Sequence, residues 1–132
     1  MGDLKRPKSD ARIIVCVSVM SNFLQDTFGL ANIVILVTGG AKGVGRMMAE
    51  SLVRAGAHVL VASRSLEDCE QAAEELSQFG QCTPLSADLS KMEELEELAN
   101  NVARDHKALH GLLNNSGRSW AAPLETFPAD RW

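Results

Sequence analysis

The sequence contains no tyrosine, and aromatic residues occupy only 5% of its 132 positions. Its three cysteines, Cys16, Cys69 and Cys82, show none of the CxxC or Cys/His spacings that hold metal ions. An odd, dispersed set of cysteines is typical of reduced thiols, so we expect a cytoplasmic protein and assign no metal ligands. The net charge of −4 lacks the basic excess typical of nucleic-acid-binding domains, which argues against nucleic acid as a partner.

Long apolar runs are also missing from the sequence. The run Ile13–Met20 spans eight residues, whereas a membrane-spanning helix needs about 20, so we expect no membrane attachment. We interpret residues 1–30 as a poorly ordered N-terminal extension, of which residues 1–19 add nothing to the fold. A targeting peptide is the alternative, although Asp3 and Asp10 interrupt the basic residues that precede the apolar run.

From residue 31 to residue 132 the chain has the alternating pattern of one α/β domain. Apolar runs predict strands over 33–37, 58–62, 82–87 and 109–114, and Pro84 suits an edge position for the third strand. Helical spacing predicts helices over 43–55 and 66–79 and a third helix after Ser90. The fold class is therefore α/β, a Rossmann-like parallel sheet with flanking helices. Right-handed crossovers should put the first two helices on one face and the third on the other.

The spacing of apolar residues also indicates which helix faces are buried. The apolar face of the first helix is marked by Val44, Met47, Met48, Leu52 and Ala55. The third helix should carry Met92, Leu95, Ala99 and Val102 inward. Ser90 and Glu93 should form a capping box, in which hydroxyl and carboxylate satisfy free N–H groups at the start of that helix.

A glycine-rich turn, Thr38–Gly45, lies between the first strand and the first helix. A helix amino terminus offers unpaired N–H groups and a positive dipole end, and glycines let the backbone approach a phosphate closely. The Walker spacing GxxxxGK[ST] is excluded because Val44 stands five residues after Gly39, and GxGxxG fails because Gly40 and Ala41 follow Gly39. The pattern present is TGxxxGxG.

This pattern resembles the short-chain dehydrogenase/reductase family, in which TGxxxGxG opens the cofactor domain. Three further segments resemble the family at matching places. They are Ser63-Arg64 after the second strand, Asp88-Leu89 after the third strand, and Asn114–Gly117 after the fourth, where Ser116 replaces the alanine of the family's NNAG. The resemblance implies a nicotinamide dinucleotide as partner. It implies the cofactor-binding set Gly39, Ala41, Lys42, Gly43, Val44, Gly45, Ser63, Arg64, Asp88, Leu89, Asn115, Ser116 and Gly117.

The pair Ser63-Arg64, which follows the second strand, favours NADP(H) over NAD(H). Ser63 stands where NAD-preferring members place an acidic residue that would repel a 2′-phosphate. Arg64 would attract that phosphate, and Lys42 inside the glycine turn can add a second positive charge.

The family's catalytic serine and YxxxK pair have no counterpart here, so we carry over no catalytic residue. The resemblance implies a chain truncated after about four strands, the first half of an NADP(H)-dependent oxidoreductase whose small carbonyl or alcohol substrate binds only in a full-length form. The alternative is a non-catalytic dinucleotide-binding or interaction module. Residues 119–125 also resemble a subgroup of 3-oxoacyl-thioester reductases, including one linked to rhamnolipid synthesis.

A sheet that ends after four strands should leave one edge open. We expect Val34, Leu36, Leu112 and Leu113 or their neighbours to meet water beside that edge, because no further helices follow to cover the second face. Such a surface favours association, so the isolated chain should be marginally stable or oligomeric through the exposed sheet edge.

Overall fold

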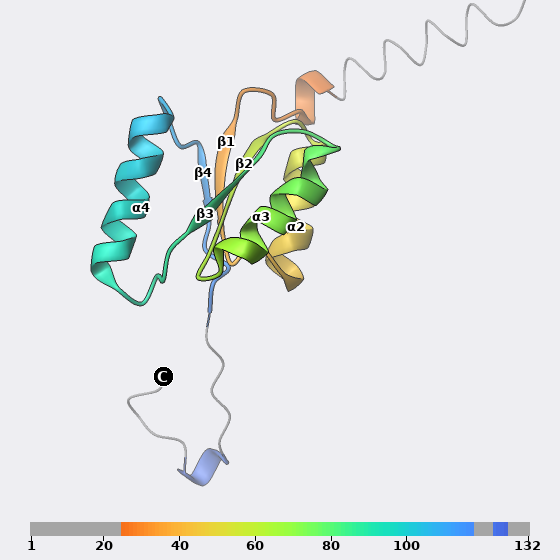
Figure 1. Ribbon diagram of the computed structural model, residues 1–132. Coiled ribbons are helices and arrows are strands. Elements are labelled where there is room, and N and C mark those ends of the chain that lie inside the picture. Colours follow the sequence, from red (N-terminus) through yellow and green to blue (C-terminus); the bar gives the residue numbers. More distant parts are fainter. Residues whose placement is uncertain (1–24, 118–122, 127–132) are drawn as a thin grey trace, which may run out of the picture.

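The computed structural model describes residues 25–117 and 123–126 (Figure 1). Residues 25–28 form a helical turn, and four strands and three longer helices then alternate along the chain. The strands are β1 (Val34–Thr38), β2 (His58–Ser63), β3 (Cys82–Ser86) and β4 (Gly111–Leu113). The helices are α2 (Gly43–Arg54), α3 (Leu66–Ser77) and α4 (Met92–Asp105), followed by a short 3₁₀ turn, η1 (Leu124–Thr126).

The four strands form one parallel sheet in the order β3-β2-β1-β4. The predicted Rossmann-like sheet is therefore confirmed. Pro84 lies on β3, an edge strand, where its missing N–H costs no hydrogen bond within the sheet. β4 forms the opposite edge and pairs with β1 over only three residues, from Ile35↔Gly111 to Val37↔Leu113.

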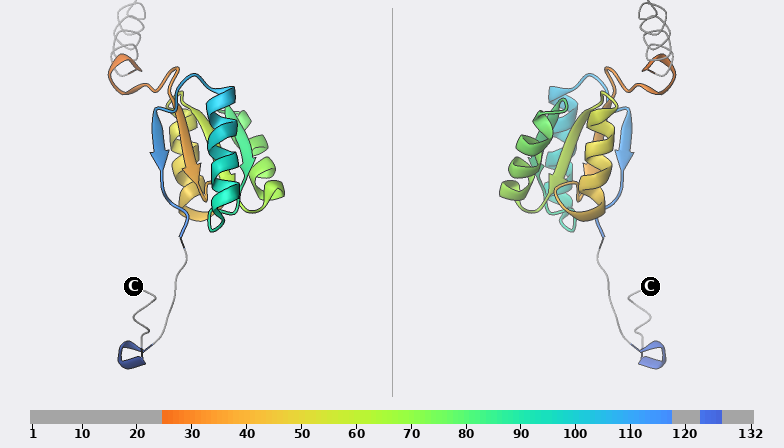
Figure 2. Two further views of the ribbon diagram at one scale, coloured as in Figure 1. Left: turned by 90° about the vertical axis from the view of Figure 1, so that its left-hand side faces the viewer. Right: turned by 90° about the vertical axis from the view of Figure 1, so that its right-hand side faces the viewer.

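The helices form two layers around the sheet, with α2 and α3 on one side and α4 on the other (Figures 1 and 2). This is the arrangement that right-handed crossovers predict. On the first side, Val37, Val59 and Val61 pack against α2 and α3 in one apolar cluster. On the second side, Leu36 and Leu60 pack against Leu98 and Val102 of α4 in another cluster.

The expected exposure of the sheet edge holds for one residue and is wrong for another. Leu112 on β4 is 52% exposed, as expected, whereas Leu36 on the neighbouring strand is buried. Leu36 is buried because α4 alone covers the part of the second face that β1 and β2 provide. Leu113 points to the opposite face and packs partly against the α2–α3 cluster.

Two predicted helix faces are also wrong in detail. In α2 the buried residues are Gly45, Ala49 and Val53, while Val44, Met47 and Met48 are exposed. The small residues at i and i+4 let the helix backbone lie close to the sheet, so this stripe faces inward although it is less hydrophobic. In α4 only Leu98 and Val102 are buried, and Met92 and Leu95 at its start are exposed.

The start of α4 differs from the predicted capping box. Its N-cap residue is Lys91, which makes no side-chain cap hydrogen bond. The Ser90 hydroxyl instead donates to Asp88 Oδ1 over 2.7 Å, because Asp88 draws Ser90 into a local turn. The carboxylate that reaches back is that of Glu94, not Glu93, and it accepts a hydrogen bond of 2.7 Å from the Asp88 amide.

The predicted extension, residues 1–30, lies mostly outside the described residues, and its division from the domain at residue 31 stays a prediction. Leu30 packs against the α2–α3 cluster, and its amide donates to the Ala55 carbonyl oxygen over 2.8 Å. Within the part of the chain that the structure describes, none of the helices combines the length and the apolar character needed to cross a membrane.

Candidate functional site

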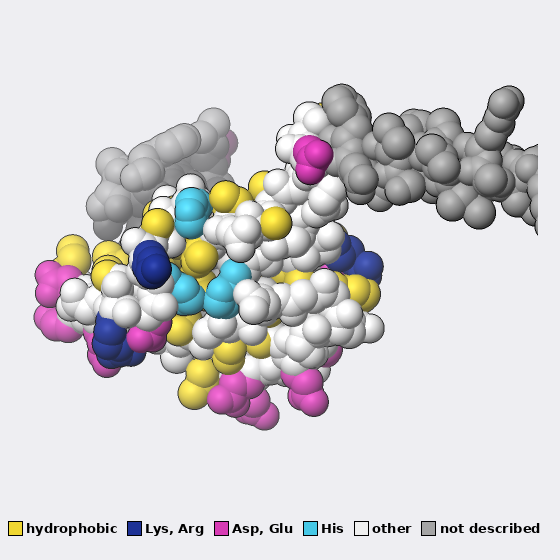
Figure 3. All heavy atoms as spheres, turned by 90° about the horizontal axis from the view of Figure 1, so that it is seen from above, with side chains coloured by type: hydrophobic (Ala, Val, Ile, Leu, Met, Phe, Trp, Pro, Cys, Tyr) yellow, Lys and Arg dark blue, Asp and Glu magenta, His cyan; other side chains and the backbone are white. Residues whose placement is uncertain are grey.

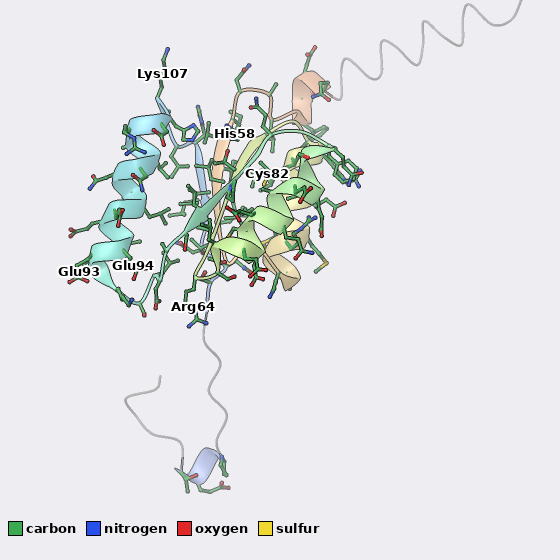
Figure 4. The ribbon with its side chains drawn as sticks, viewed as in Figure 1. His58, Arg64, Cys82, Glu93, Glu94 and Lys107 are labelled. Atoms are coloured by element: carbon green, nitrogen blue, oxygen red, sulfur yellow. The ribbon has the colours of Figure 1, made fainter. Side chains whose placement is uncertain are left out.

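The carboxyl ends of the four parallel strands meet at one edge of the sheet, and a cleft of about 470 Å³ lies there. Figure 4 places Arg64 at this end of the sheet and His58 at the opposite end. The cleft brings together eight of the residues that the sequence predicts for cofactor binding. They are Gly39, Ser63, Arg64, Asp88, Leu89, Asn115, Ser116 and Gly117.

The glycine turn connects β1 to α2, and its Gly39 lines the cleft. Gly39 has a φ of 64°, in the left-handed region that favours glycine, and its amide donates to the Ala62 carbonyl oxygen over 2.7 Å. Gly45 is buried in the first turn of α2, and a Cβ there would collide with the Gly39 carbonyl oxygen and the Asn115 side-chain amide. The missing Cβ of Gly45 therefore lets the first turn of α2 lie close to the Gly39 backbone and the Asn115 side chain, beside the cleft.

Hydrogen bonds from Thr38 tie the end of β4 to the glycine turn. The buried Thr38 hydroxyl donates to the Leu113 carbonyl oxygen (3.2 Å) and accepts from the amides of Asn115 and Ser116 (both 3.0 Å). The Asn115 side-chain amide donates back to the carbonyl oxygens of Thr38 (3.1 Å) and Gly39 (3.3 Å). These bonds fix the Asn115–Gly117 wall of the cleft. From the sequence, Thr38 was recognised only as part of the TGxxxGxG pattern, and its role in positioning this wall was not predicted.

Ser63 and Arg64 form the wall of the cleft at the end of β2. The Ser63 hydroxyl donates to the Ser65 carbonyl oxygen over 3.0 Å and lies 3.1 Å from Cys69 Sγ, so local contacts already engage it. Arg64 is exposed, and within residues 25–117 and 123–126 its guanidinium has no ion-pair partner. Arg64 is therefore the cation at this wall that is available to an anion.

Lys42 lies in a smaller cavity of about 210 Å³ beside the cleft. This cavity is lined by Gly39, Ala41, Lys42, Ser63, Arg64, Ser65 and Asp68. Lys42 Nζ lies 2.7 Å from Asp68 Oδ2, and this hydrogen-bonded ion pair lowers the pKa of the Asp68 carboxyl. Asp68 was not among the predicted site residues, because a contact between residues so far apart in sequence leaves no local signal.

Asp88 and Leu89 line the cleft at the end of β3. Asp88 Oδ1 accepts hydrogen bonds from the Ser90 hydroxyl and the Ser90 amide (3.1 Å), and these bonds lower the pKa of the Asp88 carboxyl. Leu89 packs partly against the cluster under α4. The pair thus presents an ionised, anchored carboxylate next to an apolar side chain.

Two of the predicted cofactor-binding residues lie in the glycine turn but line neither cavity. Gly43 has a φ of 57°, and Val44 is exposed on α2; neither lines the two cavities. The segment that resembles the 3-oxoacyl-thioester reductases, residues 119–125, lies largely outside the described residues. Among the residues that the structure does describe, no group of three His, Cys, Asp or Glu side chains could hold a metal ion.

Known proteins match this chain over the domain that carries the cleft. The chain is 41% identical over 105 residues to the rhamnolipids biosynthesis 3-oxoacyl-(acyl-carrier-protein) reductase of Pseudomonas aeruginosa, an alignment that covers 80% of this chain and 41% of that relative. The chain therefore spans about two fifths of the length of that relative.

Solved structures give the same result. The Pseudomonas aeruginosa RhlG/NADP active-site complex matches with a TM-score of 0.73 and 41% identity, over 78% of this chain and 40% of that one. A metagenomic short-chain oxidoreductase in complex with NADP matches with a TM-score of 0.70 and 30% identity, over 78% of this chain and 48% of that one. The sequence model of the short chain dehydrogenase family matches residues 33–132, and the chain belongs to this family.

Proposed function

We propose that this chain is the NADP(H)-binding amino-terminal portion of a short-chain oxidoreductase that acts on a carbonyl or hydroxyl substrate. The observation that carries the proposal is the cleft at the carboxyl ends of β1 to β4. In it the glycine turn, Arg64, Asp88 and the Asn115–Gly117 segment come together from four separate strands. Ligands of open parallel sheets bind at this edge of the sheet.

The residues present fit a nicotinamide dinucleotide. The close approach of Gly45 to Gly39 leaves no room for a Cβ, which is the shape a backbone cradle for a pyrophosphate requires. The amino terminus of α2 would supply N–H groups to that pyrophosphate. Asp88 and Leu89 would contact the adenine, and Asn115–Gly117 would lie beside the ribose. When bound, the nicotinamide supplies a hydride that it can exchange with a carbonyl or alcohol carbon.

Two observations support NADP(H) over NAD(H). The end of β2 carries Ser63 in place of an acidic residue, and the two cations Lys42 and Arg64 line the smaller cavity beside it. Arg64 can form charge-assisted hydrogen bonds with a 2′-phosphate, whereas NAD(H) offers only a neutral ribose diol at that point. Two of the matching solved structures are also described as NADP complexes.

Substrate chemistry is proposed on the relatives alone. The 3-oxoacyl reductase at 41% identity favours a small carbonyl compound or thioester, which only a full-length form would bind.

The free thiols of Cys69 and Cys82 are compatible with the cytoplasm, where we propose that the protein works. The absence of tyrosine from the 132 residues favours the second candidate, a dinucleotide-binding or interaction module without catalysis of its own.

Titration of the purified chain with NADPH and NADH, followed by nucleotide fluorescence, tests the proposal. We expect saturable binding of NADPH with weaker binding of NADH. Arg64→Asp should weaken NADPH binding by roughly 1.5–3 kcal/mol, the value of hydrogen bonds to a charged group, and leave NADH binding nearly unchanged. Lys107→Asp at the opposite end of the sheet makes the same charge change and is the control (Figure 4). Absence of binding to either nucleotide would disprove the proposal.

The second candidate is separated by a reductase assay. A chain that binds NADPH but does not oxidise it with 3-oxoacyl thioesters or other small carbonyl compounds would behave as a binding module. Turnover of NADPH by the 132-residue chain would exclude that reading.

A further inference from the structure

The ion pair between Lys42 and Asp68 joins the glycine turn to the first turn of α3. Its Nζ–Oδ2 distance is 2.7 Å, and the side chains are 75% and 30% exposed, respectively. The Asp68 amide donates to Ser65 Oγ, the N-cap of α3, over 3.2 Å, so the helix start fixes the backbone of Asp68. Lys42 has a long, mostly exposed side chain. Asp68 is therefore the anchored member of the pair and Lys42 the mobile one.

Both members of the ion pair line the smaller cavity, which is the proposed site of the 2′-phosphate of NADP(H). The smaller cavity shares Gly39, Ser63 and Arg64 with the main cleft, so the two lie side by side. Among the residues lining it, Lys42 and Arg64 are the cations and Asp68 is the single acidic residue. The end of β2 carries Ser63 instead of an acidic residue. The fold nevertheless places a carboxylate, that of Asp68 on α3, in the same cavity.

We propose that Asp68 limits the preference of this site for NADP(H), by holding Lys42 in the nucleotide-free chain and opposing a phosphate group in the smaller cavity. The proposal rests on the proposed function, since it concerns the same nucleotide cleft. Binding of NADPH then requires Lys42 to exchange the Asp68 carboxylate for the 2′-phosphate. NADH brings no phosphate to this point, and its ribose hydroxyls can donate to a carboxylate.

The charge of Asp68 at neutral pH follows from its contacts. The hydrogen bond and the charge of Lys42 lower the pKa of the Asp68 carboxyl, and the Ser65 contact acts in the same direction. The carboxylate is therefore ionised where nucleotide binding would be measured. Two like charges in one small subsite repel each other, and the repulsion weakens as salt screens it.

A direct test compares Asp68→Asn with Glu67→Gln. Both substitutions remove one negative charge from the first turn of α3, but Glu67 is exposed and does not line the cavity. Binding of NADPH, NADH, 2′,5′-ADP and 5′-AMP is measured by calorimetry on the full 132-residue chain. The last two probes lack the nicotinamide and differ only in the 2′-phosphate, so comparing them isolates the phosphate contact.

Asp68→Asn should tighten binding of NADPH and 2′,5′-ADP by roughly two- to fivefold, the range that exposed ion pairs span. NADH and 5′-AMP should change by less than about twofold, and Glu67→Gln should reproduce none of the gain. The gain should shrink when the ionic strength is raised to about 0.5 M. Asp68→Ser, with the same expectation, serves as the second variant if Asp68→Asn fails to fold.

A double-mutant cycle with Lys42→Met tests the exchange itself. If Asp68 acts by holding Lys42, the two substitutions should be non-additive for NADPH, and additive effects would overturn the exchange. Weaker NADPH binding by Asp68→Asn would show instead that Asp68 positions Lys42 for the phosphate. Equal gains for NADPH and NADH, or equal gains from Glu67→Gln, would also overturn the proposal. If the unaltered chain binds none of these nucleotides, the result would instead disprove the proposed function.

Discussion

The two faces of the sheet are covered to different extents. On the face toward α2 and α3, the central residues Val37, Val59 and Val61 are fully excluded from water. On the face toward α4, a single helix covers β1 and β2 while Leu112 on β4 stays half exposed. A groove of about 430 Å³ runs between α4 and β4 on this side.

The two regions therefore contribute differently to the stability of the fold, although both contribute residues to the cleft. The α2–α3 face supplies a complete apolar core, whereas β4 pairs with β1 over only three residues and is also tied to it by the hydrogen bonds of Thr38 and Asn115. The cleft nevertheless needs both regions, because Arg64 comes from the well-covered side and Asn115 from the end of β4. We infer that the Asn115 wall is the part of the cleft most easily disturbed.

The largest expected effect is on the covered face. Leu76→Ala removes a fully buried side chain of α3 and should lower the free energy of unfolding by about 2–5 kcal/mol, because it leaves a cavity in a closed core. Urea unfolding followed by circular dichroism measures the loss. Leu95→Ala on α4 makes the same substitution at a 39% exposed position and should cost far less. Equal losses would contradict the difference between the faces.

The next effect is at the junction of the two regions. Thr38→Val keeps the side-chain volume but removes the hydroxyl to which the Asn115 and Ser116 amides donate, so it should cost about 1–3 kcal/mol. NADPH binding should weaken as well, since the Asn115–Gly117 wall loses its anchor. Equilibrium unfolding and nucleotide titration measure the two losses. Thr27→Val, at an exposed position in the helical turn of residues 25–28, is the control. A stable variant with unchanged NADPH binding would show that Thr38 does not position this wall.

A smaller effect is expected from acid on the α4 side. His58 on β2 bonds Thr83 Oγ1 through Nε2 (2.8 Å) and packs edge-on against His106 at the end of α4. All three histidines gather at this end of the sheet, seen from above in Figure 3. The ring of His110 accepts a hydrogen bond of 3.0 Å from the Val34 amide at Nδ1.

Burial, and to a lesser extent the charge of His106, lower the pKa of His58 below its ordinary 6.5. As the pH falls below that value, the unfolded chain therefore binds the proton first. The contribution of His58 to stability is complete above pH 6.5 and is lost as the pH falls through the lowered pKa.

Hydrogen exchange at about pH 7.5 and 5.5 can locate this loss. Protection of α4 amides should fall more than that of α2 and α3 amides, after correction for the intrinsic pH dependence of exchange. His58→Asn removes the titrating ring and should reduce the difference. Uniform loss across all three helices would contradict the localisation to α4.

Sequence reasoning predicted the sheet, the crossover faces and most of the cleft residues, because TGxxxGxG and its companion segments follow strand ends that a parallel sheet brings together. It was wrong about the buried face of α2, where small residues, not the larger Val44 and Met47, face the sheet. It also missed Asp68 and the Glu94 cap, because both depend on side-chain contacts that only the folded chain sets. Exposure of Leu112 was predicted correctly, since it needed only the position of β4 at the sheet edge.

The smallest expected change in unfolding free energy is at that edge. Leu112→Glu replaces an exposed apolar side chain and should change monomer stability by no more than about 0.5 kcal/mol. It should nevertheless shift self-association toward the monomer, because a charge beside an open strand opposes edge-to-edge pairing. Sedimentation velocity over a range of concentrations measures this shift, with Leu66→Glu on the α3 side as the matched exposed control. A concentration-independent monomer with a cooperative melt before any substitution would show that the open edge drives no association.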